Sequence, residues 1–183
     1  MTPKNFALAL ALTCLISLSQ AAPVPEAINS AAIMPRTFSS AMLNPDITQA
    51  NIQETVCRKH FTKTIRPGVA YTNNVKFRLM RDAGIPEEDA GLFELDHIVP
   101  LSIGGHPRNL VNLMLQPYQG VLGAKQKDRL ELKLQNMVCD GDIDLATAQK
   151  EIGGDWVAAY RKFIKHKGHR KGRPDTGSID TPR

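Results

Sequence analysis

The sequence has only 3 cysteines among its 183 residues, and no two of them have the close Cys-x-x-Cys spacing of a structural zinc site. It contains no internal repeat and no glycine-rich phosphate loop, which excludes repeat architectures and the common nucleotide-binding folds. Its 5 histidines do not gather into the ligand set of a zinc hydrolase. The apolar run from Phe6 to Leu18 is too short to span a bilayer comfortably.

Residues 1–21 instead have the pattern of a signal peptide. Lys4 supplies the positive charge, Phe6–Leu18 the apolar centre, and Ser19–Ala21 the small residues that precede a cleavage site. A retained membrane anchor is the alternative. We expect the segment, with Cys14, to be removed, and the mature protein to be secreted or periplasmic without a stable membrane association.

Cleavage would leave two cysteines, Cys57 and Cys139. An even pair in an exported chain predicts a disulfide, and a zinc site is the weaker alternative because close ligand spacing is missing. In the chain-entropy model, closing a loop of this length stabilises the fold by roughly 4 kcal/mol.

Three segments are expected after the signal peptide. Residues 22–53 have few charges and no sustained period, which predicts a linker with a short helix near Ile47–Thr55. Residues 54–165 form the predicted domain, and residues 166–183 a flexible basic tail. From Arg161 to Arg183 there are eight lysines or arginines and two aspartates, a net charge of +6, against 14 basic and 16 acidic residues in 22–160. Such a tail would attract polyanions in a salt-dependent way, or merely keep the protein soluble.

The centre of the domain is an apolar run, Phe93–Leu101, with an adjacent acid and imidazole in its middle. A second extended run, Asn109–Tyr118, follows a turn, and a helix is expected to start within Gly123–Glu131. The predicted order is strand, long loop, strand, helix, and the fold class is α+β. Further helices are predicted from the cap Asn73 to Arg81, from Leu145 to Ile152 after the cap Asp144, and after the cap Asp155, where Trp156 is expected to anchor the core. The helix after the second strand is expected to bury one apolar stripe, Leu130, Leu134, Met137 and Val138.

The acid and the imidazole are Asp96 and His97. Burial costs both of them solvation, so such a pair is usually partnered or bound to a cation. Neighbours in a regular strand leave on opposite faces, but near Pro100, where the strand ends, both can approach one cleft. Asp96 would hold a hard divalent ion through oxygen, and neutral His97 could take a proton from water.

These residues resemble a known family, the HNH endonucleases of the ββα-metal fold. The matching motifs are Asp96–Leu101, Gly104–Gly105, and Asn112–Leu113 before the helix. The resemblance implies a ββα hairpin-helix core, with His97 as general base, Asp96 as metal ligand and Asn112 as the brace of the loop. It also implies 5′-phosphate and 3′-hydroxyl products. A narrower resemblance, to small secreted bacterial HNH-type proteins, rests on Cys57, Thr64–Pro67, Tyr71–Asn73, Lys127–Glu131, Val138–Cys139 and Asp155–Trp156.

The helix start departs from that family. The family has a histidine or asparagine there to complete the metal site, whereas this chain has neither in Gly123–Asp128. Asp128 or Glu131 could supply the missing oxygen, with Lys127 contacting a phosphate. Lys127 and Glu131 are four apart, so they could also simply pair on the helix surface.

Three loop residues complete the candidates. Arg108 is placed to grip a phosphate with a two-pronged contact. His106 could contact substrate or a metal, although a loop histidine is more often merely exposed. Asn109 competes with Asn112 for the bracing role, and Asn112 fits the second-strand pattern better.

The predicted function is hydrolysis of phosphodiester bonds in DNA, with RNA as a further substrate, at low sequence specificity. Mg²⁺ is the expected cofactor, with Mn²⁺ or Zn²⁺ as alternatives. The rival is a degenerate relative that binds nucleic acid or another polyanion without cutting it. An inhibitor protein would be a further partner, which no motif identifies.

Overall fold

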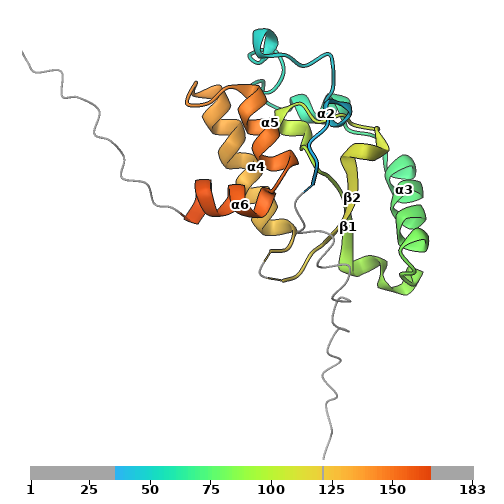
Figure 1. Ribbon diagram of the computed structural model, residues 1–183. Coiled ribbons are helices and arrows are strands. Elements are labelled where there is room, and N and C mark those ends of the chain that lie inside the picture. Colours follow the sequence, from blue (N-terminus) through green and yellow to red (C-terminus); the bar gives the residue numbers. More distant parts are fainter. Residues whose placement is uncertain (1–35, 121, 166–183) are drawn as a thin grey trace, which may run out of the picture.

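The computed structural model describes residues 36–120 and 122–165, and the fold is α+β, as predicted (Figure 1). A two-stranded antiparallel sheet pairs β1 with β2, and α4 follows it, so the order strand, long loop, strand, helix is also confirmed. The strands and α-helices are β1 Phe93–His97, β2 Leu113–Pro117, α2 Phe61–Ile65, α3 Val69–Asp82, α4 Ala124–Cys139, α5 Leu145–Gly153 and α6 Trp156–Tyr160. Short 3-10 turns occupy Ser40–Met42, Gln49–Asn51, Glu87–Leu92, Leu101–Ile103 and Leu110–Asn112, and a π-helical turn Arg161–Lys165.

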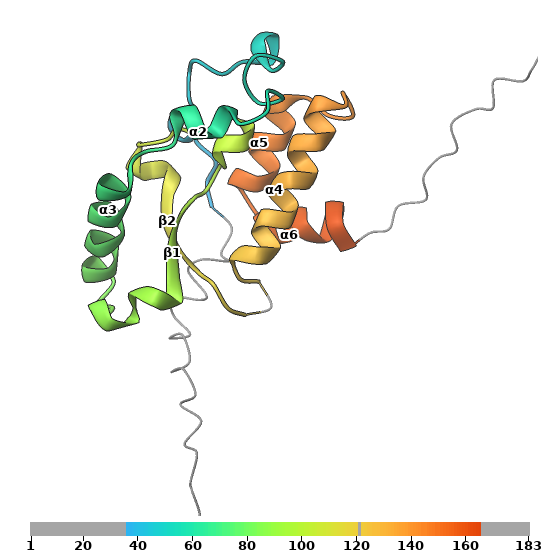
Figure 2. The same cartoon turned by 180° about the vertical axis from the view of Figure 1, so that it is seen from behind.

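The hairpin lies between α3 on one side and the helices α4, α5 and α6 on the other (Figure 2). Its register pairs Phe93 with Pro117 and His97 with Leu113. Alternate strand residues point to opposite faces. Phe93 packs with Met80 of α3, whereas Asp96, on the other face, forms an ion pair with Lys127 of α4. The end of β1 therefore meets α4 through polar side chains.

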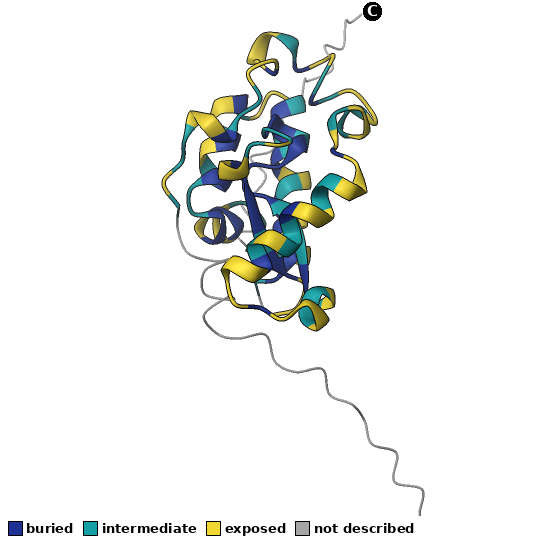
Figure 3. Ribbon diagram, turned by 90° about the vertical axis from the view of Figure 1, so that its right-hand side faces the viewer, coloured by how far each residue is buried: buried dark blue, intermediate teal, exposed yellow. Residues whose placement is uncertain are grey.

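The larger core lies among α4, α5 and α6. In Figure 3, buried segments lie toward the middle of the molecule and exposed ones at its outside. In the predicted apolar stripe of α4, Leu130, Leu134 and Val138 are each at most 1% exposed, whereas Met137 is half-buried. Trp156 is buried in the same core, as expected for an anchor. The predicted caps are present too: Asp144 accepts a hydrogen bond from the Thr147 amide, and Asp155 from the Ala158 amide. Within the described ranges, no helix is long and apolar enough to cross a membrane.

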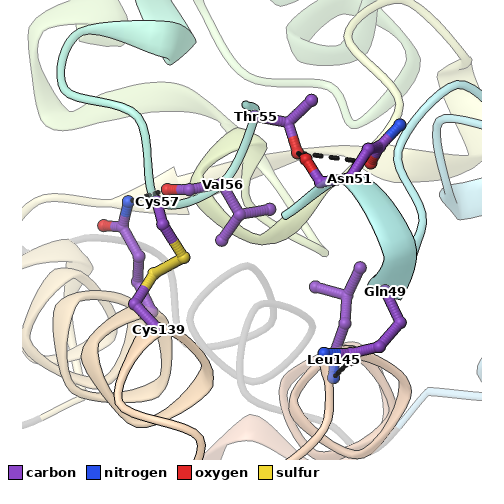
Figure 4. The surroundings of a disulfide bond; sticks show 8 residues. Gln49, Asn51, Thr55, Val56, Cys57, Cys139 and Leu145 are labelled. Atoms are coloured by element: carbon purple, nitrogen blue, oxygen red, sulfur yellow. Dashed lines mark hydrogen bonds between the residues drawn. A yellow bond between two sulfur atoms is a disulfide. The ribbon is translucent and has the colours of Figure 1, made fainter. Parts of the chain in front are cut away.

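The predicted disulfide joins Cys57 to Cys139 at the end of α4 (Figure 4). It links positions 82 residues apart. Gln49 reinforces the junction, since its side-chain oxygen accepts a 2.7 Å hydrogen bond from the amide of Leu145 at the start of α5. The disulfide is compatible with an extracellular location. Export itself stays a prediction, because residues 1–21 lie outside the described residues.

The structure differs from two predictions about the N-terminal half. Residues 36–53, expected to belong to a linker, pack into the core, with Met42, Ile47 and Ile52 buried. Irregular turns place these apolar side chains in the core, so the sequence of this segment has no helical or strand periodicity that would predict their burial. Helix α3 starts at Val69, after an extended Gly68, and the expected cap Asn73 is exposed inside the helix.

Candidate active site

A hollow of about 230 Å³ opens where the end of β1 meets α2 and α4. Four carboxylates line it: Glu94, Asp96, Asp128 and Glu131. His97 also lines this hollow. The structure thus brings the predicted acids and the predicted base to one place, and we call it the acidic hollow.

His97 is held as a neutral imidazole with a fixed tautomer. Its Nε2 lies 3.1 Å from the carbonyl oxygen of Pro107, and because a carbonyl only accepts, Nε2 carries the proton. The residue is 7% exposed, and burial lowers the pKa of His97 despite the opposite effects of the Pro107 carbonyl and Asp96. In the described part of the chain, no protein group forms a hydrogen bond with Nδ1. The Nδ1 lone pair is therefore not taken up by a described protein donor, and His97 lines the acidic hollow.

Asn112 braces the loop that holds this histidine. Its side chain is fully buried, accepts a 2.8 Å hydrogen bond from the Val99 amide and donates to the carbonyls of Val99 and His106. The loop is tight at this point, because a Cβ on Gly105 would lie 1.7 Å from the Val99 oxygen. Asn109 has a different role, capping the 3-10 turn at Leu110–Asn112.

Replacing Asn112 with alanine is expected to destabilise the fold by roughly 3 kcal/mol, since it leaves buried backbone groups without partners. Urea unfolding measures the loss. Asn109→Ala is the matched control, because it removes one amide–side-chain bond at a half-buried site and should cost about 1 kcal/mol. Equal losses in both variants would mean that Asn112 is not the brace.

Lys127 is not exposed to a substrate. Its ammonium lies 2.8 Å from Asp96 Oδ2, 2.7 Å from Glu131 Oε1 and 2.7 Å from the His97 carbonyl oxygen. The residue is 1% exposed, and these contacts use all three of its N–H donors. Burial alone would lower the pKa of Lys127, but the attraction of Asp96 and Glu131 outweighs it and raises the pKa above the ordinary value. The arrangement does not fit the predicted phosphate contact, because a permanently charged lysine is enclosed between two acids.

The same arrangement bears on the predicted metal site. Both oxygens of Asp96 have partners, since Oδ1 accepts a 2.7 Å hydrogen bond from the His97 amide and Oδ2 pairs with Lys127. Glu131 Oε1 shares that ammonium. Among the described residues, no three acidic, histidine or cysteine side chains are arranged to hold a metal ion. The expected ligands Asp96, Asp128 and Glu131 thus line one hollow without forming a ready three-ligand site, and a lysine occupies the position between two of them.

Negative charge is in excess in the acidic hollow. Burial, reinforced by repulsion from Asp96 and Asp128, raises the pKa of Glu94 to about 7. Burial likewise raises the pKa of Glu131 to about 7, against the attraction of Lys127. Carboxyl groups with a pKa near neutral pH are unusual, and they favour a functional role for this hollow.

A second hollow, of about 270 Å³, adjoins the first. Arg66, Glu94 and His97 line both, so the imidazole stands between them. The second hollow carries Asn73 and the exposed guanidinium of Arg66, whose charge helps to lower the pKa of His97 after the larger effect of burial. Its wall thus offers donors for an anion next to the candidate base.

Arg108 and His106 lie outside both linings. The Arg108 guanidinium stacks on the Tyr71 ring, 4.6 Å from the ring centroid, and the Tyr71 hydroxyl donates to the Arg108 carbonyl oxygen. His106 Nδ1 accepts from the amides of Arg108 and Asn109, so this imidazole orders the turn. Arg108 is exposed and able to meet a phosphate outside the two hollows, whereas the unprotonated nitrogen of His106 is already in use.

Two residues of the site have no predicted catalytic role, Glu94 and Arg66. Glu94 stands two positions before Asp96, and the strand period puts both on one face, so the signal for Glu94 was present. Arg66 follows α2, and only the packing of the whole chain brings it beside His97.

Comparison with protein-family models, curated proteins and solved structures finds no match to this chain. The function is therefore inferred from the residues and their geometry.

Proposed function

We propose that this chain is an endonuclease that hydrolyses phosphodiester bonds of DNA, and of RNA as a further substrate, with little sequence preference. The single observation that carries the proposal is His97. It is a neutral imidazole with a fixed tautomer and an Nδ1 that no described protein donor engages, and it lines the carboxylate-rich hollow together with Arg66. A base of this kind, beside a place for an anion, suits the attack of water on a phosphodiester.

The reaction follows from these positions. His97 Nδ1 takes a proton from a water molecule while the oxygen of that water forms a bond to phosphorus, in line with the departing 3′ oxygen. The P–O3′ bond breaks, and the 3′ oxygen keeps the electron pair and takes a proton from solvent. Arg66 offers a charged donor to the phosphate oxygens as negative charge builds up on them. The products are a 5′-phosphate and a 3′-hydroxyl.

The hairpin and α4 would form the ββα core of an HNH-type site. In support, β1 ends at the Asp96–His97 pair, Asn112 ties the returning strand to Val99, and α4 closes the site with Lys127 and Glu131. A divalent ion bound by Asp96, Asp128 or Glu131 stays a prediction. No step above depends on it, because Lys127 stands between two of those ligands.

Nucleic acid is the proposed partner because exposed arginines flank the base. Arg66 lines both hollows, and Arg108 lies just after Pro107, whose carbonyl holds His97. The basic tail 166–183 would add sequence-independent attraction to the backbone, although it lies outside the described residues. Secretion or periplasmic export belongs to the same proposal.

A second candidate is a protein that binds nucleic acid without cutting it. The observation in its favour is the Lys127 ammonium, which ties up Asp96 and Glu131. A fully paired acid contributes less to catalysis than a free one.

Nicking of supercoiled plasmid by the full chain separates the two. The assay is run in Mg²⁺, in Mn²⁺ and in EDTA, with gel-shift binding measured on the same DNA. Cleavage in any of these conditions, with 5′-phosphate ends, supports the endonuclease. Binding without cleavage in all of them supports the second candidate, and neither binding nor cleavage rejects both.

A further inference from the structure

Lys127 has an environment that is unusual for a lysine. The side chain is 1% exposed, and its ammonium is surrounded by two carboxylate oxygens and one carbonyl oxygen at 2.7–2.8 Å. Lysine is seldom fully buried, and when it is, its charge must be compensated. Here the compensation comes from Asp96 and Glu131, two of the acids expected to bind a divalent ion.

The surrounding atoms are also those that a hard divalent cation prefers. Carboxylate and backbone carbonyl oxygens are the usual ligands of Mg²⁺ and Ca²⁺. In this structure three such oxygens, from β1 and α4, converge on a nitrogen that belongs to the chain itself. The positive charge is therefore supplied by α4 and is fixed in place by folding.

We propose that the Lys127 ammonium is the resident cation of the acidic hollow, in the position that a divalent ion would otherwise take between Asp96 and Glu131. The consequence, which rests on the proposed endonuclease function, is that cleavage needs no added metal ion. Lys127 acts as a positioning residue, since its three donors are all used by protein oxygens. It neutralises the acids next to the incoming phosphate and fixes the end of β1 through the His97 carbonyl.

Electrostatics favours one cation here rather than two. A divalent ion on Asp96 would lie within a few ångströms of the ammonium, and like charges at that distance repel strongly in a partly buried site. Asp96 Oδ1 is also engaged by the His97 amide, which leaves this carboxylate few free positions. An ion that took these oxygens away from Lys127 would leave a buried ammonium without partners.

The first test uses wild-type protein stripped of metal. We expect plasmid cleavage in EDTA at a rate within about threefold of the rate in Mg²⁺, because Arg66 and His97 do not depend on a bound ion. Cleavage that stops in EDTA and returns with Mg²⁺ or Mn²⁺ would overturn the proposal while leaving the endonuclease intact. This arm needs no variant, so it does not depend on the folding of one.

The second test replaces Lys127 with methionine, which keeps the length of the side chain and removes the charge. We expect cleavage in EDTA to fall about 100-fold and to return when Mg²⁺ or Mn²⁺ is added, since Asp96 and Glu131 are then free to bind it. Lys125→Met is the matched control, an exposed lysine on the same helix, and should keep wild-type behaviour. A purely structural lysine would give a loss that no ion restores, and that result would overturn the proposal.

Binding of Mn²⁺, followed by calorimetry, decides the proposal even if the chain cleaves nothing. The wild-type protein should show no binding that depends on Asp96, and Lys127→Met should gain one site that Asp96→Asn removes. A wild-type site that Asp96→Asn abolishes would contradict a resident lysine.

Discussion

Replacing His97 with asparagine is expected to lower the rate of plasmid cleavage by about 10³-fold and to leave DNA affinity unchanged. Asparagine cannot take a proton from water, whereas Arg66 and Arg108, the residues proposed to meet phosphate, are untouched. Nicking rates and gel-shift affinities measured on the same preparation check the two halves of this expectation. Circular dichroism confirms that the variant is folded.

His60→Asn is the control for this substitution. His60 is exposed, lies outside both linings and has a left-handed backbone angle, φ 66°, which asparagine tolerates. It should cleave as the wild type does.

Because the pKa of His97 is lowered, first by burial, the wild-type rate should fall with decreasing pH only below the range in which a free imidazole titrates. Full cleavage by His97→Asn would remove this residue from the mechanism.

Removing the disulfide is expected to have the largest effect on stability. Changing both Cys57 and Cys139 to serine should lower the free energy of unfolding by about 4 kcal/mol, because the bond closes a long loop in the unfolded chain. Urea unfolding measures the difference.

Dithiothreitol provides the internal control. It should lower the stability of the wild type to that of the double variant and leave the variant unchanged. If the oxidised wild type and the variant unfold at the same urea concentration, the disulfide does not stabilise the fold.

The hairpin and the helices that follow it could be predicted because their signals are local. The apolar run at Phe93–Leu101 stops at a proline, Asp144 and Asp155 are recognisable caps, and the stripe of α4 repeats at helical spacing. The disulfide could be predicted because two cysteines, an even number, remain in a chain expected to be exported.

The segment 36–53 and the pairing of Lys127 depend on tertiary packing instead. Met42 is buried because the loop after β1 returns beside it, where the amide of His106 donates to the Met42 carbonyl oxygen. Lys127 lies four residues before Glu131, a spacing that suggested a pair on the helix surface. In the fold, Asp96 of β1 also contacts the ammonium, so the lysine lies buried between the two acids. Neither contact has a signature at short sequence range.

The most direct test of a His97 base is the state of its ring in solution, read by NMR from long-range ¹H–¹⁵N couplings and assigned by the loss of signals in His97→Asn. At neutral pH, Nε2 should carry the proton and Nδ1 should be unprotonated, as the 3.1 Å contact to the Pro107 carbonyl requires. A proton on Nδ1, either in the opposite tautomer or in a charged ring, would contradict the proposed mechanism.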